Sequence, residues 1–397
     1  MSQMDRRRAL KFLAALGASG LAAACTNRAA SDYGAVPLSD DPVRVGLVVP
    51  QTGGYRQIGD ELADGFQLFL NLNDGRLGGH KVDLLVADEG ETAASGTAAV
   101  ESLLKKNVLA LTGVASSAVM LAVRDVVEKA KVPLIGSNAS PSNLQGVVYI
   151  WRTSYVNDEP GRALGPYVAG KVTGRIAMVA PDYPAGRDSI DGFREGFGKS
   201  DRRIADPTIW TDFVATPNES FFGPTVQQLR QAAPAAIYCF FAEAAAVEFV
   251  KQVRAGGLEQ PIFAPGFLTE GTVLSQLGDA AQGISTALNY SADLSNTANQ
   301  RFASAYRRNH ESSPTTYAMA SYDAAQVLDK AIRIAGERLT PVKLNLALAK
   351  VGQIDSPRGP WQFNTPRTPQ QKWYLREVQR DGQLWSNVLI DELAMLG

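Results

Sequence analysis

The segment Leu109–Ser140, LALTGVASSAVMLAVRDVVEKAKVPLIGSNAS, holds one complete strand–helix–strand unit. It opens with an apolar run typical of a buried strand, and a second short apolar strand follows at 133–136. Between them, apolar residues recur at helical spacing from 118 to 130, and Pro133 cannot continue that helix. Parallel strands joined by a helix send their carboxyl ends to one edge of a sheet, where open α/β folds bind ligands.

Polar residues follow both strands of this unit. Ser116 and Ser117 stand where the helix begins, and Asn138 and Ser140 follow the second strand. Serine side chains commonly cap helix N–H groups, and the same N–H groups attract carboxylates. A plain helix cap and a small-molecule site are therefore both open for the two serines. The second hydroxyl-rich tip favours the small-molecule site.

Length and composition bound the fold class and the partners. The chain has 397 residues, which is enough for two α/β lobes. Hydrophobic residues make up 45% of the chain and charged residues 20%, a composition typical of soluble globular proteins. Residues 1–24 hold four basic residues and one acidic residue, so their removal changes the formal net charge from −1 to −4. No basic stripe indicates a nucleic-acid partner. Cys239 lies in an apolar run and is expected to be a buried hydrophobic residue without a disulfide partner.

The first 24 residues have the features of an export signal. A basic region at Arg6–Arg8 precedes an apolar segment at 12–24 that is too short to span a bilayer. The arginines resemble a twin-arginine signal, with the general secretory route also open. The run Leu21–Cys25 resembles a bacterial lipobox. We therefore expect a lipid on Cys25, a polar tether behind it, and a protein anchored at the outer, periplasmic face of the cytoplasmic membrane.

Strand and helix patterns alternate along the rest of the chain in two successive sets, at 43–153 and at 175–290. Polar residues interrupt the alternation at 153–160, which indicates a crossing between lobes, and two further crossings are expected near 283–287 and 361–366. The sequence therefore predicts an α/β fold of two doubly wound, Rossmann-like lobes joined by three hinge crossings. The expected division is a signal peptide (1–24), a lipidated tether (25–42), lobe 1 (43–157 plus 286–363) and lobe 2 (158–285 plus 364–397).

Short motifs spread over the mature chain resemble one known family when their order and spacing are taken together. They are Pro50-Gln51-Thr52-Gly53, Asp88, Gly113 with Ser116-Ser117, Pro133-Leu134-Ile135, Arg152-Thr153, and Tyr322-Asp323-Ala324 after Tyr306 and Pro314. In this order they resemble the type I periplasmic substrate-binding proteins of ABC importers, in particular the branched-chain amino acid (Leu/Ile/Val) receptors. The resemblance implies a monomeric two-lobe clamp that closes on one small molecule and delivers it to an ABC permease in the membrane.

The resemblance also implies which residues bind the ligand. Hydroxyl and backbone N–H groups at Ser116, Ser117, Ala139 and Ser140 are expected to hold a carboxylate, beside Asn138. An aromatic residue at Tyr183 is expected to close over the ligand.

The sequence departs from the family where acidic residues usually bind an ammonium group. Asn157 stands at one such position with Asp158 beside it, and Phe267 stands at the other with Glu270 three residues later. Two ligand classes are therefore open. One is a branched-chain amino acid or related small carboxylate, and the other is an aromatic carboxylate or amide walled by rings such as Tyr155.

The residue inventory does not indicate an enzyme, a metal site or a cofactor. His80 and His310 are the only histidines, and neither has neighbours at metal-ligand spacing. No nucleophile elbow or phosphate-binding loop occurs. The leading interpretation is an importer's solute receptor. The alternative of the same fold is a binding module that serves a sensor or activates a cell-wall enzyme.

Overall fold

The computed structural model describes residues 38–144 and 146–397. The predicted signal peptide, Cys25 and most of the predicted tether lie outside the described residues. The end of that tether was placed too late, because residues 39–42 already belong to strand β1 (Ser39–Val49), whose Ser39 pairs with His80 of β3.

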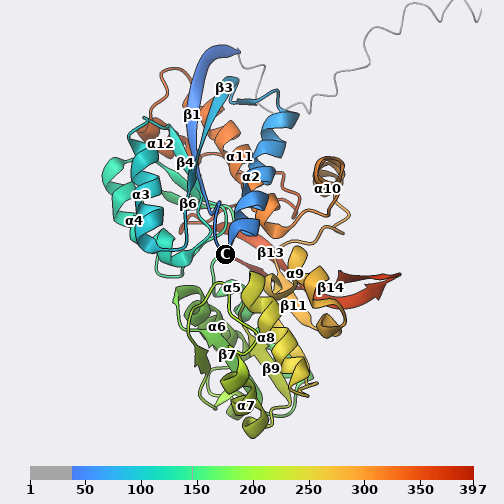
Figure 1. The fold of residues 1–397 in the computed structure, drawn as a ribbon. Coiled ribbons are helices and arrows are strands. Elements are labelled where there is room, and N and C mark those ends of the chain that lie inside the picture. Colours follow the sequence, from blue (N-terminus) through green and yellow to red (C-terminus); the bar gives the residue numbers. More distant parts are fainter. Residues whose placement is uncertain (1–37, 145) are drawn as a thin grey trace, which may run out of the picture. The chain divides into compact units, whose positions relative to one another are not determined.

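The first sheet has six strands in the order β2-β3-β1-β4-β5-β6 (Figure 1). Apart from the antiparallel edge strand β2, neighbouring strands are parallel. Its other strands are β2 (Arg76–Leu77), β3 (His80–Asp88), β4 (Ala110–Gly113), β5 (Leu134–Gly136) and β6 (Ile150–Arg152). Its helices are α2 (Arg56–Leu72), α3 (Ala93–Leu104), α4 (Ser117–Ala130), α10 (Thr297–His310), α11 (Thr316–Ala335) and α12 (Pro341–Leu348).

The second sheet repeats this arrangement, with the order β8-β7-β9-β10-β11 for its parallel strands and an antiparallel extension of β13, β12 and β14. Its strands are β7 (Ile176–Pro181), β8 (Ile209–Thr211), β9 (Ala236–Cys239), β10 (Ile262–Pro265), β11 (Ser285–Leu288), β12 (Gln362–Phe363), β13 (Pro369–Asp381) and β14 (Leu384–Leu396). Its helices are α5 (Glu159–Lys171), α6 (Pro184–Phe197), α7 (Gly223–Ala232), α8 (Glu243–Ala255) and α9 (Thr272–Leu277), with 3₁₀ turns at Arg202–Ile204, Gly266–Thr269 and Gly278–Ala281.

Both sheets are doubly wound, which fixes where a ligand can bind. Among the parallel strands of each sheet, the first strand in the chain has the second on one side and the third on the other. The chain therefore winds in opposite directions from the first strand, and the strand ends leave a crevice at this switch point. The switch points lie between β1 and β4 in the first sheet and between β7 and β9 in the second.

Helices bury both faces of each sheet because successive strand residues point to opposite sides. In the first sheet α2 and α11 cover one face and α3 and α4 the other (Figure 1). In the second sheet, Tyr238 of β9 packs in the core under α5 and α6, and its neighbour Cys239 packs in the core under α7 and α8. Cys239 is a free, fully buried thiol, as the sequence indicated.

The predicted fold class of two doubly wound lobes is confirmed, with corrections at the C-terminal side. The predicted boundary at 286 is wrong, since β11 pairs with β10 and β13, so residues 286–288 lie in the second lobe and the chain leaves it after Leu288. Helix α12 and strand β14 were not predicted. Helix α12 has only eight residues, and β14 is a half-exposed hairpin strand without regular alternation of apolar and polar residues.

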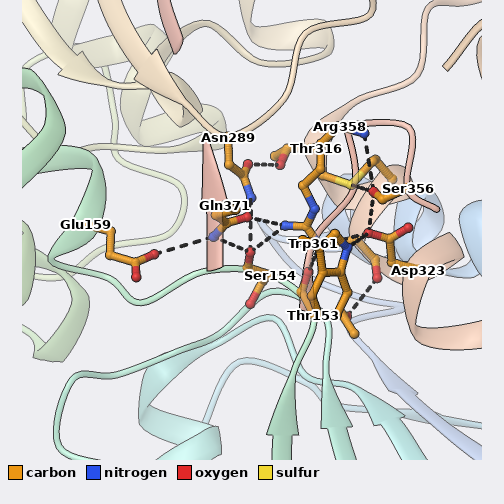
Figure 2. Close-up of polar contacts among 12 residues, drawn as sticks. Thr153, Ser154, Glu159, Asn289, Thr316, Asp323, Ser356, Arg358, Trp361 and Gln371 are labelled. Carbon is orange, nitrogen blue, oxygen red and sulfur yellow. Dashed lines mark hydrogen bonds and ion pairs between the residues drawn. The ribbon is translucent and has the colours of Figure 1, made fainter. Parts of the chain in front are cut away.

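The three segments that connect the lobes meet at one backbone carbonyl, that of Ser154 (Figure 2). It accepts hydrogen bonds from Asn289 Nδ2 (3.0 Å), Gln371 Nε2 (3.1 Å) and Arg358 Nη1 (2.8 Å). Ser154 follows β6, Asn289 follows β11, and Gln371 lies in β13. Side chains from the second and third connections are thereby tied to the backbone of the first.

Arg358 links this junction to the core of the first lobe. Its Nη2 donates to Asp323 Oδ2 of α11 at 2.8 Å, and its side chain is 1% exposed. The same carboxylate oxygen accepts from Ser356 Oγ (2.7 Å) and Trp361 Nε1 (2.9 Å), as Figure 2 shows. We call the group Ser154, Asn289, Asp323, Arg358 and Gln371 the hinge cluster.

Candidate functional site

A cavity lies at the switch points of both sheets. It has about 40 Å³ of space for the centres of water-sized spheres, several times what one water needs. Residues after β1, β4 and β5 line it from the first lobe, and residues after β7, β9 and β10 from the second. The lining residues are Tyr55, Ile58, Ala115, Ser116, Ser117, Asn138, Ala139, Tyr155, Asn157, Tyr183, Ala185, Phe240, Ala242, Phe267 and Tyr317.

The two serines are not simple helix caps. Ser116 is the N-cap residue of α4, but its side chain makes no capping hydrogen bond. The Ser117 hydroxyl is buried and accepts from Asn157 Nδ2 at 3.1 Å, which leaves its proton free to be donated. The structure therefore presents two hydroxyl groups to the cavity, as expected for a polar ligand group.

An unusual backbone turn places these serines. Gly113 has φ +104°, and a Cβ there would lie 2.1 Å from the carbonyl oxygen of Val48. Val114 follows with φ +65°, a left-handed conformation that β-branched residues rarely adopt. Its carbonyl accepts from Ala139 N at 2.9 Å, which ties the turn after β4 to the tip after β5. Such strain persists where the surrounding structure fixes it, and it gathers at functional sites.

A buried carboxylate that the sequence analysis missed occupies part of this helix N-terminus. Glu89 Oε2 accepts from Ala115 N at 2.7 Å, and Oε1 accepts from Ser116 N at 2.8 Å. Burial raises the pKa of Glu89 to about 7, although these two hydrogen bonds oppose the rise. A ligand carboxylate cannot use these two N–H groups, and the hydroxyls of Ser116 and Ser117 are the side-chain donors at this end.

Of the predicted residues after β5 and β6, three line the cavity and one does not. Asn138 and Ala139 line it, and Asn138 is held by hydrogen bonds to Ala115 O (2.8 Å) and from the Tyr155 hydroxyl (3.2 Å). Asn157 lines it beside Ser117. Ser140 does not line it, because its hydroxyl lies behind the tip and accepts from Arg152 Nη1 at 3.3 Å.

Aromatic rings form the remaining walls. Tyr183 and Phe267 line the cavity, and Phe267 packs against Tyr155 with ring centroids 5.2 Å apart. Seven lining residues were not singled out from the sequence, namely Tyr55, Ile58, Ala115, Ala185, Phe240, Ala242 and Tyr317. Phe240 comes directly after strand β9 and Tyr55 lies in the turn between β1 and α2, so both are aromatic residues at strand-end tips, as Tyr183 is. No comparable signal marked Tyr317, which is the second residue of α11 and follows helix α10 rather than a strand.

No Asp, Glu, Lys, Arg or His among the described residues lines this cavity. The acidic candidates of the family pattern are engaged elsewhere. Asp158 forms an ion pair with Arg162 (3.7 Å), and Glu270 forms one with Arg376 (2.8 Å). The side chains that line the cavity are therefore uncharged: they carry hydroxyl, amide, aromatic and aliphatic groups.

Hydrogen bonds join the two lobes beside the cavity. Asp188 of α6 accepts from the backbone N–H of Ser142 (3.0 Å) and from its hydroxyl (2.5 Å), which belong to the first lobe. Asn157 Nδ2 donates to both Ser117 of the first lobe and Asp188 of the second, at 3.1 Å each. The described arrangement is thus one in which the lobes touch around the cavity.

Two further observations concern the described part of the chain. Within residues 38–144 and 146–397, no group of three or more His, Cys, Asp or Glu residues is placed to hold a metal ion. None of the helices in these ranges combines the length and the apolar character needed to span a membrane.

Comparison with known proteins agrees with the fold. A model of a family described as periplasmic binding protein matches residues 42–383. The chain belongs to this family. The sequence-based prediction of a solute-binding protein is thereby confirmed.

Individual relatives of this binding protein have different ligands in their names. A Leu/Ile/Val-binding protein homolog of Brucella suis is 24% identical over 350 residues, which cover 86% of this chain and 88% of that protein. A solute-binding protein of an ABC transporter from R. palustris, solved with benzoate, is 27% identical with a TM-score of 0.81, covering 89% and 97% of the two chains. Another, from Rhodopseudomonas palustris BisB5 and solved with 3,4-dihydroxybenzoic acid, is 26% identical with a TM-score of 0.83, covering 90% and 99%.

Proposed function

We propose that this periplasmic binding protein is the solute receptor of an ABC importer and that its ligand is a small aromatic carboxylate. The observation that carries the proposal is the cavity lining, in which six side chains are aromatic and none is charged. A planar ring packs against such walls, and Ser116 and Ser117 supply hydroxyl donors for its carboxylate. The two relatives solved with benzoate and with 3,4-dihydroxybenzoic acid support this ligand class.

A branched-chain amino acid is the second candidate, favoured by the name of the Brucella relative. Its ammonium group would need an acidic partner or several acceptors, because an unpaired buried charge is costly. The nearby buried carboxylates Glu61, Glu243 and Glu270 do not line the cavity. The cavity as described therefore suits the aromatic acid better.

Replacing Ser117 by alanine tests the carboxylate site. A hydrogen bond to a charged group contributes about 1.5–3 kcal/mol, so Ser117→Ala is expected to weaken benzoate binding about ten- to a hundredfold. Binding of the neutral benzamide should change much less. Calorimetric titration of both compounds, together with leucine and isoleucine, measures this and ranks the two ligand classes.

Ser142→Ala is the matched control. It removes one hydroxyl that bridges the lobes at Asp188 without lining the cavity, so it should affect acid and amide alike. An equal loss of acid and amide binding in Ser117→Ala would show that Ser117 only joins the lobes through Asn157. Tight binding of leucine without binding of benzoate would contradict the aromatic ligand.

We also propose that Cys25 carries a lipid and holds the protein at the outer face of the cytoplasmic membrane as a monomer. The support is the apolar segment before Cys25 and the polar stretch behind it. The periplasmic family places the protein outside the cytoplasm. Mass spectrometry of the protein from native membranes should find a diacylated residue 25, and an N-terminus at another residue would contradict the anchor.

The hinge cluster supports a further part of the proposal, namely that the lobes rotate about the three connections at Ser154, Asn289 and Gln371. Each connection needs only a few dihedral changes for rigid-body closure. In this view the ligand stabilises the closed arrangement described above, which is the form presented to the permease.

A further inference from the structure

A second, smaller cavity adjoins the first. It has about 10 Å³ of space for water-sized spheres and lies within the second lobe and against Tyr55 of the first. Four residues line both cavities and so form the wall between them: Tyr55, Tyr183, Phe240 and Ala242. The residues that line only the second cavity are Pro181, Asp212, Phe213, Val214, Phe221, Phe222, Phe241 and Ala245.

The second cavity adjoins the first cavity at an aromatic wall, formed by Tyr55, Tyr183 and Phe240. The serine and asparagine side chains of the first cavity, at Ser116, Ser117, Asn138 and Asn157, do not line it. Apart from Asp212 and the phenol groups of the shared wall, its side chains are apolar. It therefore suits a small hydrocarbon group of about the size of one water, and Asp212 is its one charged residue among the described residues that line it.

The two tyrosines of the wall between the cavities pack against a partly exposed ring, Phe213. Phe213 is 37% exposed and packs on Tyr183 with ring centroids 4.3 Å apart, and on Tyr55 at 6.1 Å. Phe213 belongs to the stretch between β8 and α7, which forms neither helix nor strand. Rotation of exposed rings in such a stretch is fast and costs little packing, so a ligand substituent can displace them.

The stretch between β8 and α7, which contains Phe213, also reaches the first lobe. A Cβ built on Gly54 would lie 2.9 Å from the Cβ of Ala215, two residues after Phe213. The stretch 212–215 therefore covers the side of the cavities where the two lobes meet.

We propose that the second cavity is a subsite for an apolar substituent on the ligand ring, on the side away from the carboxylate. The ligands that use both cavities are aromatic carboxylates with an alkyl chain at the para position. This assignment rests on the proposed function, since the carboxylate at Ser116 and Ser117 sets the direction of the ring.

The test is a series of ligands of increasing length with one variant that fills only the second cavity. Benzoate and its 4-methyl, 4-ethyl and 4-propyl derivatives are titrated against the wild-type protein and Ala245→Leu. Ala245 lies in the first turn of α8 and lines only the second cavity. In the wild type, affinity should rise about fourfold per added methylene, the equivalent of ~0.8 kcal/mol.

In Ala245→Leu the affinity for benzoate should stay within about twofold of wild type, while the gain for the longer acids disappears. Ala185→Leu is the matched control, because Ala185 lines only the first cavity and its enlargement should weaken every member of the series. Thermal unfolding of each variant shows that it is folded.

Three outcomes overturn the subsite. One is that benzoate binds the wild type but 4-propylbenzoate binds no tighter, which leaves the proposed function intact. Another is that Ala245→Leu weakens benzoate as much as the longer acids. The third is that no benzoate derivative binds at all, which removes the aromatic ligand and the subsite with it.

Discussion

Replacing Arg358 by leucine is expected to lower the free energy of unfolding by about 3–5 kcal/mol, because it leaves the charge of Asp323 buried without a partner. Both side chains are almost completely buried, at 1% and 0% exposure. Burial raises the pKa of the Asp323 carboxyl, and Arg358 is the main group that opposes the rise. The variant also removes the hydrogen bond from Arg358 to the carbonyl of Ser154, which leaves that carbonyl with two of its three donors.

Urea denaturation of the ligand-free protein measures this effect. Lys372→Ala is the control, since Lys372 and Glu392 form an ion pair of about the same length, 2.7 Å, but each is nearly half exposed. Its loss is expected to cost less than about 1 kcal/mol. The double variant Arg358→Leu with Asp323→Leu should recover part of the stability, because no buried charge then remains. A single Arg358→Leu variant as stable as the Lys372→Ala control would contradict this account.

The hinge cluster shows what the sequence could not reveal. An arginine in a Pro-Arg-Gly-Pro stretch reads as an exposed turn residue, because most arginines are exposed. Its burial follows only from the approach of three chain connections that are far apart in sequence, at Ser154, Asn289 and Gln371. Polar residues at such junctions carry no periodic pattern.

The sheets and their switch points, by contrast, could be predicted. Buried parallel strands such as β4 and β7 are short apolar runs between helices, and their order of appearance restricts the topology to a few alternatives. Strand-end positions then pointed to Ser116, Ser117 and Tyr183, which all line the cavity. The same rule extends to Tyr55 and Phe240.

The role of Glu89 could not be predicted from its position at a strand end. Asp88 is one of the residues that carry the family resemblance and is the last residue of β3, and it binds the turn after β1 by accepting from Gln51 N and Thr52 Oγ1, both at 2.8 Å. The next residue, Glu89, points to the opposite side and binds the turn after β4, where it accepts from Ala115 N and Ser116 N. Two adjacent acids at a strand end thus serve two different turns, and only the three-dimensional structure assigns them.

A cluster of buried acids beside the cavity leads to a second large effect, on the pH dependence of stability. Glu61 comes from α2 of the first lobe, whereas Glu243 and Glu270 come from the second lobe. Glu270 is compensated by Arg376 (2.8 Å) and by the backbone N–H of Thr316 (2.9 Å).

Neither Glu61 nor Glu243 forms an ion pair with a basic residue in the part of the chain that the structure describes. Glu61 accepts hydrogen bonds from Thr315 and Gln57, and no described residue donates a hydrogen bond to the Glu243 carboxylate. Glu243 also has φ +52° at the start of α8. Burial, followed by repulsion from Glu61 and Glu270, raises the pKa of Glu243 to about 8.

Glu61 is shifted in the same direction. Burial is the main cause and Glu270 adds to it, so the pKa of Glu61 is about 7 although the Thr315 hydroxyl opposes the shift. Asp64, on the next turn of α2, adds a further negative charge, and His310 pairs with it at 3.2 Å. Arg376 contributes a positive charge to this cluster of acids through its ion pair with Glu270.

These raised pKa values determine the sign of the effect. In the unfolded chain both acids titrate near 4.5, so between pH 4.5 and about 7–8 the folded protein binds more protons than the unfolded chain. Their contribution to stability is therefore fully present below about pH 4.5 and is lost as the pH rises through 7–8. Since one pH unit of difference corresponds to ~1.4 kcal/mol, ionising either acid costs on the order of 3–5 kcal/mol.

Glu243→Gln is expected to remove this cost at high pH and to change little at low pH, where the acid is already protonated. Relative to wild type, the variant should gain stability between pH 5.5 and 8.5, by on the order of 3 kcal/mol. Burial also raises the pKa values of Glu89 and Glu159 to about 7, so they contribute to the pH dependence of the wild-type stability. The difference in stability between Glu243→Gln and the wild type removes their contribution and leaves that of Glu243. Urea midpoints at both pH values, with exposed Glu101→Gln as the control, provide the measurement. A difference that stays constant from pH 5.5 to 8.5 would show that Glu243 is ionised without cost.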